Sequence, residues 1–253
     1  MSMLENIQTG RENKPPRIMV YGQEGVGKST LGASAPDPIF IQTEDGLGEI
    51  DCCKFPLAQS VEDVIIELTA LRDEEHNFRT VVIDSLDWLE RLIFDEICKE
   101  FGVRSIEKAD GGYGKGYVDA LVHWRKVLAL LDDLRNKRGM MVILLAHAKV
   151  ERFEDPENAA YDRYSPRLHK HAASLISEWV DTVLFATKRM RVSKDGDSRM
   201  IAAPIGADGG ERIIRTNGSP ACIAKNRYGL PNEIPLSWDE FIQVYRNCVA
   251  PAS

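Results

Sequence analysis

One short segment of the sequence combines glycines, a lysine and a serine at a spacing that can hold phosphate. Residues 22–29, Gly-Gln-Glu-Gly-Val-Gly-Lys-Ser, fit the pattern G-x-x-x-x-G-K-[ST] at every fixed position. The glycines let the backbone wrap around phosphate, and a helix opening at Lys28 adds its positive N-terminal end. A chance match in a chain of this length is on the order of one in a hundred. The pattern predicts a nucleotide-phosphate site formed by Gly22, Gln23, Glu24, Gly25, Val26, Gly27, Lys28, Ser29 and Thr30.

Asp84 is placed to complete that site with a metal ion. It closes the apolar run Thr80–Ile83, and a carboxylate at the end of such a strand holds Mg²⁺ in phosphate-loop enzymes. The Ser29 hydroxyl would supply a second metal ligand, while Lys28 would reach the β- and γ-phosphates of ATP. The alternative is an ordinary strand-ending aspartate that caps the next helix. The phosphate loop favours the metal-binding role.

A further acidic position follows the apolar run Ile39–Ile41. The carboxyl ends of parallel strands face the ligand crevice of an open sheet, so Glu44 can orient the water that attacks the γ-phosphate. Asp45 is its immediate neighbour and could do the same. Both side chains could instead belong to a solvated acidic turn, and spacing alone does not separate these alternatives.

These polar residues are expected on a sheet of mostly parallel strands. Continuous apolar runs alternate with segments of helical periodicity, which indicates an α/β fold with helices on both faces of the sheet and a short antiparallel extension. Two long polar segments, 103–117 and 148–166, are expected to be loops. The expected strands are 17–21, 39–41, 80–84, 140–146 and 181–186, with short ones near 199–203, 212–216 and 221–225, and the expected helices are 28–35, 60–75, 86–101, 118–138, 167–178 and 238–248.

Length and composition are those of an ordinary globular protein. Of the 253 residues, 43% are hydrophobic and 28% are charged, which excludes a disordered chain, a fibre and a coiled coil. No run approaches ~18 apolar residues, so we expect no membrane span, and the polar N-terminus lacks the apolar stretch of a signal peptide. We expect a flexible arm over 1–16, a single ATPase domain over 17–235, and a C-terminal helix and tail over 236–253.

Charge and cysteine content narrow the partners and the compartment. Thirty-two basic and 39 acidic residues give a net charge of −7, so any contact with DNA must come from a local patch. Five cysteines, an odd number with no CxxC pair, indicate a reduced, cytoplasmic protein without a structural zinc site. His169 and His171 have no cysteine or carboxylate at ligand spacing, so we expect no metal there.

The order of the polar segments resembles the core of a RecA-like P-loop ATPase. This resemblance covers roughly residues 17–235. Residues 112–116 and 144–147 carry a narrower resemblance to the compact phage-type recombination ATPases, some of which are Sak-type single-strand annealing proteins. The resemblance implies that Glu44 is the catalytic carboxylate and that His147, at the end of its strand, senses the γ-phosphate. Five segments carry the likeness in this order: residues 22–29, Glu44, Thr80–Ser85, Val142–His147 and Lys225–Arg227.

Lys225 and Arg227 would act at a boundary between subunits. Alternation along an extended segment puts both side chains on one face, with Asn226 opposite. Two neighbouring cations repel each other, so the pair is expected to need an anion between them. The resemblance implies that this anion is the γ-phosphate bound by the next subunit of a homo-oligomer. The alternative is a solvated basic turn.

The resemblance also implies contact with single-stranded DNA through two loops, at about 103–117 and 148–167. Basic groups would meet phosphates, and aromatic rings would stack on bases. Acidic residues outnumber the cations in most of the second loop, and a solvated connection is the alternative for both. The residues expected to contact DNA are Arg104, Lys108, Tyr113, Lys115, Arg163 and Arg167.

These patterns together predict a cytoplasmic protein that binds and hydrolyses ATP with Mg²⁺ and acts on single-stranded DNA in phage recombination or annealing. Its expected partners are further copies of the chain, in a ring or a filament, and a single-strand-binding protein; a membrane is not among them. Two alternatives remain open. One is a RecA-like regulatory ATPase with a protein partner, and the other is a P-loop kinase of small molecules, which would need a lid over the phosphates.

Overall fold

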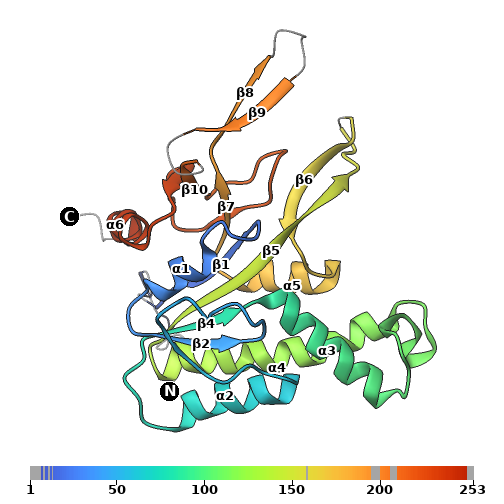
Figure 1. Ribbon diagram of the computed structural model, residues 1–253. Helices are drawn as coiled ribbons and strands as arrows, with labels where there is room; N and C mark the ends of the chain where they lie inside the picture. Colours follow the sequence, from blue (N-terminus) through green and yellow to red (C-terminus); the bar gives the residue numbers. More distant parts are fainter. Residues whose placement is uncertain are drawn as a thin grey trace.

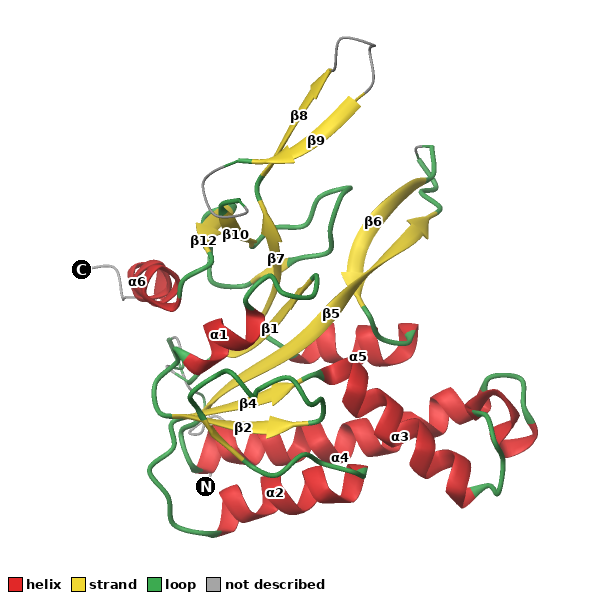
Figure 2. Ribbon diagram, in the orientation of Figure 1, coloured by secondary structure: helices red, strands yellow, loops and turns green. Residues whose placement is uncertain are grey.

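A sheet of ten strands forms the centre of the molecule, with helices on both faces (Figures 1 and 2). The structure is a computed structural model that describes residues 7, 9–10, 12, 14–157, 159–194, 200–205 and 210–249. A separate two-stranded sheet projects from the body at one end (Figure 1). Within these ranges, none of the helices has the length and hydropathy needed to span a bilayer.

Strands and helices mostly alternate along the chain up to β7. The helices are α1 (Lys28–Ala33), α2 (Val61–Asp73), α3 (Leu86–Glu100), the 3₁₀ helix η2 (Ile106–Gly111), α4 (Lys115–Lys137), α5 (Lys170–Trp179) and α6 (Trp238–Val249). The strands are β1 (Arg17–Gly22), β2 (Pro38–Gln42), β3 (Cys53–Lys54), β4 (Thr80–Asp84), β5 (Met141–Phe153), β6 (Tyr161–Pro166), β7 (Thr182–Lys188), β8 (Met190–Lys194), β9 (Met200–Pro204), β10 (Arg212–Arg215), β11 (Lys225–Asn226) and β12 (Glu233–Pro235).

The core of the sheet is parallel and its additions are antiparallel. The parallel strands stand in the order β7-β1-β5-β4-β2-β3, and β6, β10, β11 and β12 pair antiparallel with their neighbours. β1 lies between β5 and β7, so Gly22 at its end is opposite His147 on one side and Ala186 on the other. This confirms the predicted α/β fold with a RecA-like core and an antiparallel extension.

Alternate residues of each central strand face two different hydrophobic cores. Met19 and Tyr21 of β1 pack with side chains of α2, α3, α4 and α5, whereas Ile18 and Val20 pack with those of α1 and α6. Because helices cover both faces, both sets of side chains are buried. The same burial explains why these strands appear in the sequence as continuous apolar runs.

The segment expected to be a polar loop at 148–166 is instead a β-hairpin. β5 continues beyond the sheet to Phe153, and β6 returns beside it, with Glu151 opposite Arg163 and Phe153 opposite Tyr161. Figure 1 shows this ribbon extending away from the body. The loop prediction was wrong because charged residues occupy both faces of the ribbon, which removes the apolar alternation typical of a half-buried strand.

Smaller differences concern the other expected loop and the ends of the chain. The segment 103–117 contains η2, and α4 begins inside it at Lys115. The strands β3, β8 and β12 were not predicted. The strand expected near 199–203 is β9, although residue 199 lies outside the described residues, as do residues 1–6, 8, 11 and 13 of the expected arm and residues 250–253 of the expected tail.

Candidate active site

The glycine-rich segment forms the turn between β1 and α1. Gly22 ends β1 so close to β7 that a Cβ atom there would collide with the Ala186 carbonyl oxygen. Gly27, directly before α1, has a φ of 109°, in the left-handed region that glycine adopts without strain. Lys28 is 6% exposed, and its Nζ donates to the carbonyls of Gly22 and Gln23 at 3.1 Å each. The ammonium is therefore held against the loop, where it attracts an anion.

Ser29 and Asp84 form the closest polar contact of the site. The Ser29 hydroxyl donates to Asp84 Oδ2 at 2.6 Å. Burial raises the pKa of Asp84, and although the bond from Ser29 opposes this rise, the nearby Glu44 charge adds to it. A cation between the hydroxyl and the carboxylate would favour the ionised form.

This pair fits Mg²⁺ better than a metal held by protein groups alone. Mg²⁺ in phosphate sites takes one or two protein ligands and completes its shell with phosphate oxygens and water. In the part of the chain that the structure describes, no group of three or more His, Cys, Asp or Glu side chains could hold a metal. Ser29 and Asp84 are therefore suited to a metal that arrives together with a nucleotide.

Glu44 reaches the same site from the end of β2. Thr43 ties this end to β4, because its Oγ1 accepts the Ser85 N–H at 2.9 Å and donates to the Ser85 carbonyl at 2.7 Å. The Ser85 hydroxyl in turn donates to Glu44 Oε2 at 3.0 Å. Glu44 lines the pocket, whereas the neighbouring Asp45 is exposed and outside its lining. The structure thus separates the two carboxylates that spacing left equal.

His147 enters the site from β5 and is held by a carboxylate that no sequence pattern indicated. Asp87, in the first turn of α3, accepts the His147 backbone N–H on Oδ1 at 3.0 Å and lies 3.0 Å from ring Nδ1 through Oδ2. Burial would raise the pKa of Asp87, but the hydrogen bonds from His147 outweigh it and lower the pKa overall. In the sequence, Asp87 looks like any acidic residue in a first helical turn, so no signal distinguished it.

These groups surround one pocket of about 460 Å³. Arg212 of β10 lines it as well, and a Cβ atom at Gly27 would lie 3.2 Å from the Arg212 guanidinium. No local pattern predicted this, because only the pairing of β10 with β7 brings an exposed arginine to the phosphate loop. The lining residues are Glu24, Gly25, Gly27, Lys28, Ser29, Thr30, Glu44, Gly46, Ile50, Asp84, His147 and Arg212.

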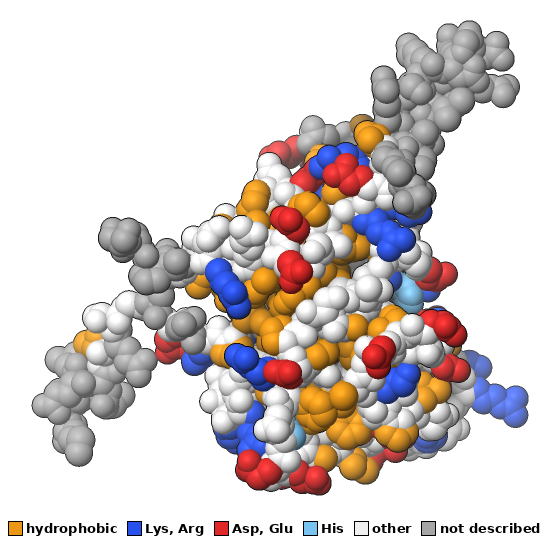
Figure 3. Space-filling model, turned by 60° about the vertical axis from the view of Figure 1, so that its left-hand side comes forward, with side chains coloured by type: hydrophobic (Ala, Val, Ile, Leu, Met, Phe, Trp, Pro, Cys, Tyr) orange, Lys and Arg blue, Asp and Glu red, His pale blue; other side chains and the backbone are white. Residues whose placement is uncertain are grey.

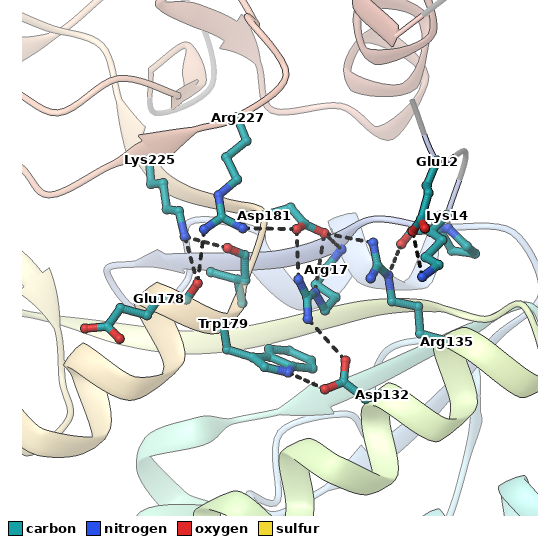
Figure 4. A network of polar contacts seen from close by, with 12 residues as sticks. Glu12, Lys14, Arg17, Asp132, Arg135, Glu178, Trp179, Asp181, Lys225 and Arg227 are labelled. Atoms are coloured by element: carbon teal, nitrogen blue, oxygen red, sulfur yellow. Dashed lines mark hydrogen bonds and ion pairs between the residues drawn. The ribbon is translucent and has the colours of Figure 1, made fainter. Parts of the chain in front are cut away.

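Lys225 and Arg227 lie near the amino ends of the parallel strands, away from the pocket at their carboxyl ends. β11 pairs with the first residues of β7, whereas the phosphate loop lies beside its far end. Lys225 Nζ donates to three backbone carbonyls within Ser177–Val180 at 2.6 to 3.0 Å, and Arg227 lies 3.6 Å from the Asp181 carboxylate (Figure 4). Both cations therefore have partners in their own chain, and their contact with the phosphate of a neighbouring subunit stays a prediction.

Four of the residues expected to contact DNA connect α3 to α4. Tyr113 is fully exposed, and its backbone has a φ of 55°. Lys115 is 3.5 Å from Asp110, while the other two cations are exposed. This connection offers an aromatic ring and free cations on one loop. Its four members are Arg104, Lys108, Tyr113 and Lys115.

The other two expected DNA contacts belong to the hairpin and the segment that follows it. Arg163 pairs with Glu151 at 3.1 Å and lies over the ring of Phe153. Arg167 pairs with Glu24 of the phosphate loop at 3.2 Å. The hairpin and the α3–α4 connection lie apart in Figure 1, and the face drawn in Figure 3 mixes basic with acidic side chains. Two of the six expected contacts, Arg163 and Arg167, are therefore already paired with carboxylates.

The chain is similar to known proteins to different degrees. The chain is 24% identical over 183 residues to the SPbeta prophage-derived uncharacterized protein YorG of Bacillus subtilis (strain 168), which covers 71% of this chain and about half, 52%, of that protein. The solved RadB recombinase shares 13% identity at a TM-score of 0.48, with 90% of each chain covered, and a likeness of that size says nothing about function. The family model described as "AAA domain" matches residues 14–228. The chain therefore belongs to the AAA domain family of P-loop ATPases.

Proposed function

We propose that this chain binds ATP together with Mg²⁺ and hydrolyses it. The observation that carries the proposal is the meeting of Lys28, the Ser29–Asp84 pair and Glu44 around one pocket. These groups supply three parts that phosphoryl transfer needs: a cation for the phosphates, ligands for the metal and a base beside the attacking water.

Each side chain has one task in this proposal. Lys28 exchanges the carbonyls of Gly22 and Gln23 for phosphate oxygens. Ser85 holds one oxygen of the Glu44 carboxylate, which leaves the other to accept a proton from water. Ser29 and Asp84 would hold Mg²⁺, which would neutralise negative charge on the phosphate oxygens.

Glu44→Gln tests this assignment most directly, with Asp45→Asn as its matched control. The amide keeps the shape of the side chain but cannot accept the proton, so we expect ATP binding to persist and turnover to fall by ~10²–10⁴. Asp45→Asn removes the same charge one residue away and should hydrolyse ATP normally. Phosphate release reports both rates. Normal turnover in Glu44→Gln would contradict the role, and loss in Asp45→Asn alone would move it to Asp45.

We further propose that this ATPase acts on single-stranded DNA in phage recombination or annealing, as a homo-oligomer. The exposed ring of Tyr113 lies in the same connection as the exposed cations Arg104 and Lys108. This supports DNA contact, since stacking and phosphate contacts together hold single strands. The prophage-derived relative supports a phage setting. The pairing of Arg163 and Arg167 with carboxylates favours the alternative, a regulatory ATPase with a protein partner.

ATPase rates separate these two functions. We expect single-stranded DNA to stimulate phosphate release, and a single-strand-binding protein to change that stimulation. Duplex DNA of the same length is the control for a general polyanion effect. A rate that no DNA changes would contradict the DNA role and favour the regulatory ATPase, while leaving ATP hydrolysis itself in place.

A further inference from the structure

The two ring nitrogens of His147 have different surroundings. Nδ1 lies 3.0 Å from Oδ2 and 3.2 Å from Oδ1 of Asp87, whose carboxylate also accepts the His147 backbone N–H. Both residues are buried, with exposed fractions of 8% for His147 and 4% for Asp87. Among the described residues Nε2 has no hydrogen-bond partner, and the ring lines the pocket proposed for the nucleotide. Nε2 is therefore left for a ligand.

Asp87 decides which ring nitrogen carries a proton. An ionised carboxylate only accepts hydrogen bonds, so Nδ1 beside it must carry the proton. In a neutral ring Nε2 is then bare, and its lone pair would repel a phosphate oxygen. Only the doubly protonated ring has an N–H on both sides and can donate to Asp87 and to phosphate at once.

We propose that Asp87 is a positioning residue that lets His147 contact the γ-phosphate only as an imidazolium, so that binding of ATP takes up a proton from solvent whereas binding of ADP does not. The proton joins Nε2, which donates it in a hydrogen bond to a γ-phosphate oxygen, and no covalent bond to phosphate changes. This inference rests on the proposed ATP site.

Several carboxylates lie around the ring. Glu44 Oε2 lies 3.8 Å from Nδ1, and Asp84 interacts with the ring across the pocket. Lys28 is a cation that lines the same pocket, and it interacts with the same carboxylates. The γ-phosphate adds negative charge that ADP lacks at this position. The charged groups around the ring are Asp87 and Glu90 on α3, Glu44 after β2, Asp84 on β4, Lys28 on α1, Lys149 on β5, and Arg167 after β6, whose guanidinium pairs with Glu24.

Titration calorimetry measures the proton directly. The Mg²⁺ complexes of ADP and of the non-hydrolysable methylene analogue of ATP are titrated into the protein in buffers of different ionisation enthalpy, across neutral to alkaline pH. For the ATP analogue we expect uptake of up to one proton per site. Its affinity should fall by up to about tenfold per pH unit at the alkaline end of this range, because the protonated form that binds becomes scarcer. ADP should show neither effect.

Asp87→Asn is the matched variant, because it keeps the size of the side chain and one oxygen for the His147 backbone N–H. Its amide would donate to Nδ1, so the neutral ring would carry its proton on Nε2 and could contact phosphate without uptake. We expect the ATP analogue to bind with an affinity that varies within about twofold over the same pH range. His147→Gln, whose amide donates at any pH, should lose the proton uptake too, and adding Asp87→Asn to it should change nothing further.

The outcomes separate this inference from the proposed function. Equal proton uptake for the ATP analogue and ADP, or unchanged uptake in Asp87→Asn, would overturn the inference while leaving ATP binding intact. A purely structural Asp87 would give that second result together with a lower melting temperature. Should Asp87→Asn fail to fold, unchanged uptake in His147→Gln would overturn the inference by itself. If neither nucleotide bound at any pH, the proposed function would fail and the inference with it.

Discussion

Two clusters of buried charge lie at opposite edges of the same parallel sheet. At the carboxyl ends of the strands, Lys28 and Asp84 border an open pocket. At the amino ends, Asp181 accepts the backbone N–H of Arg17 at 3.0 Å and its guanidinium at 3.1 Å, and Arg135 lies 3.4 Å away (Figure 4). Both clusters join carboxylates to cations, so residue type alone does not distinguish them.

The difference lies in which ions each cluster stabilises. Burial would raise the pKa of Asp181, but hydrogen bonds from Arg17 outweigh it and lower the pKa, so the folded protein favours the ionised form. In the pocket, burial raises the pKa of Asp84 and lowers that of Lys28, which disfavours both ions. Charged side chains whose ionised forms are disfavoured, and that border a pocket, are typical of a functional site. Charged side chains that pair with one another away from a pocket are typical of a structural site.

Substitution of Arg227 tests whether the amino ends of the strands in one subunit contact the pocket of the next subunit. If Arg227 of one subunit contacts the γ-phosphate of the next, Arg227→Ala should lower turnover by ~10³–10⁵, the effect of an arginine finger. Mixing it with Lys28→Ala should restore part of the activity, because some interfaces then pair an intact Arg227 with an intact Lys28. Lys225 is held by three carbonyls, so we expect Arg227, which is 52% exposed, to carry this role alone.

The measurement is the rate of phosphate release. It is made for each variant, for the mixture, and for the wild type over a range of protein concentrations. For the wild type we expect the rate to rise more steeply than linearly with protein concentration. If the rate is strictly proportional to protein concentration and mixing restores no activity, Arg227 acts only within its own subunit. The amino-end cluster, which is Asp181 with Arg17, Arg135, Lys225 and Arg227, would then be purely structural.

Asp181→Asn should cause the largest loss of stability. The substitution removes the anion that pairs with both Arg17 and Arg135, although Asp132 still pairs with Arg17 at 3.1 Å. Breaking a buried pair costs about 3–5 kcal/mol of unfolding free energy, and we expect a loss at the lower end of that range because of this second partner. Lys28→Met in the pocket should change stability by less than about 1 kcal/mol or raise it, since functional sites often sacrifice stability. Urea unfolding of both variants makes the comparison. Equal losses at the two edges would mean that both clusters hold the fold together.

The sequence predicted the pocket better than the elements around it. The phosphate loop and Asp84 carry their own pattern, and β1, β4 and β5 are continuous apolar runs because helices cover both faces. The hairpin of β5 and β6 was missed because neither of its faces is apolar. Asp87 and Arg212 were missed because their roles arise from pairings between distant segments, α3 with β5 and β10 with β7, which leave no local signal.

The candidate DNA contacts can be compared by neutralising two pairs of cations. Neutralising Arg104 and Lys108 should weaken binding of single-stranded DNA and reduce the slope of log affinity against log salt by about 1.4, or roughly 0.7 for each phosphate that the variant no longer neutralises. Neutralising Arg163 and Arg167 should change the slope less, because each already has a carboxylate partner. Fluorescence anisotropy at several salt concentrations gives both slopes. The reverse order would show that DNA displaces those carboxylates and that the hairpin is the binding element.

Lys225→Met should give the smallest effect on stability. It tests what the contacts of Lys225 at the C-terminal end of α5 contribute. The last carbonyls of α5 lack partners within the helix, and Lys225 Nζ satisfies three carbonyls at this end. Methionine keeps most of the aliphatic stem but removes the donor and the charge, so we expect a loss of about 1–2 kcal/mol of unfolding free energy. Nucleotide affinity should not change, because the pocket lies at the other edge of the sheet.

Lys137→Met is the matched control for that variant. Lys137 also lies in the last turn of a helix, α4, but its side chain is 63% exposed and pairs with Asp133 at 2.9 Å. An exposed pair of this kind contributes little, so we expect a change within about 0.5 kcal/mol. If the two variants unfold at the same urea concentration, the carbonyl contacts of Lys225 add nothing to stability. The stabilising contacts of the amino-end cluster would then be those between Asp181 and its arginines. Lys225 would be available to act with Arg227 at a subunit interface.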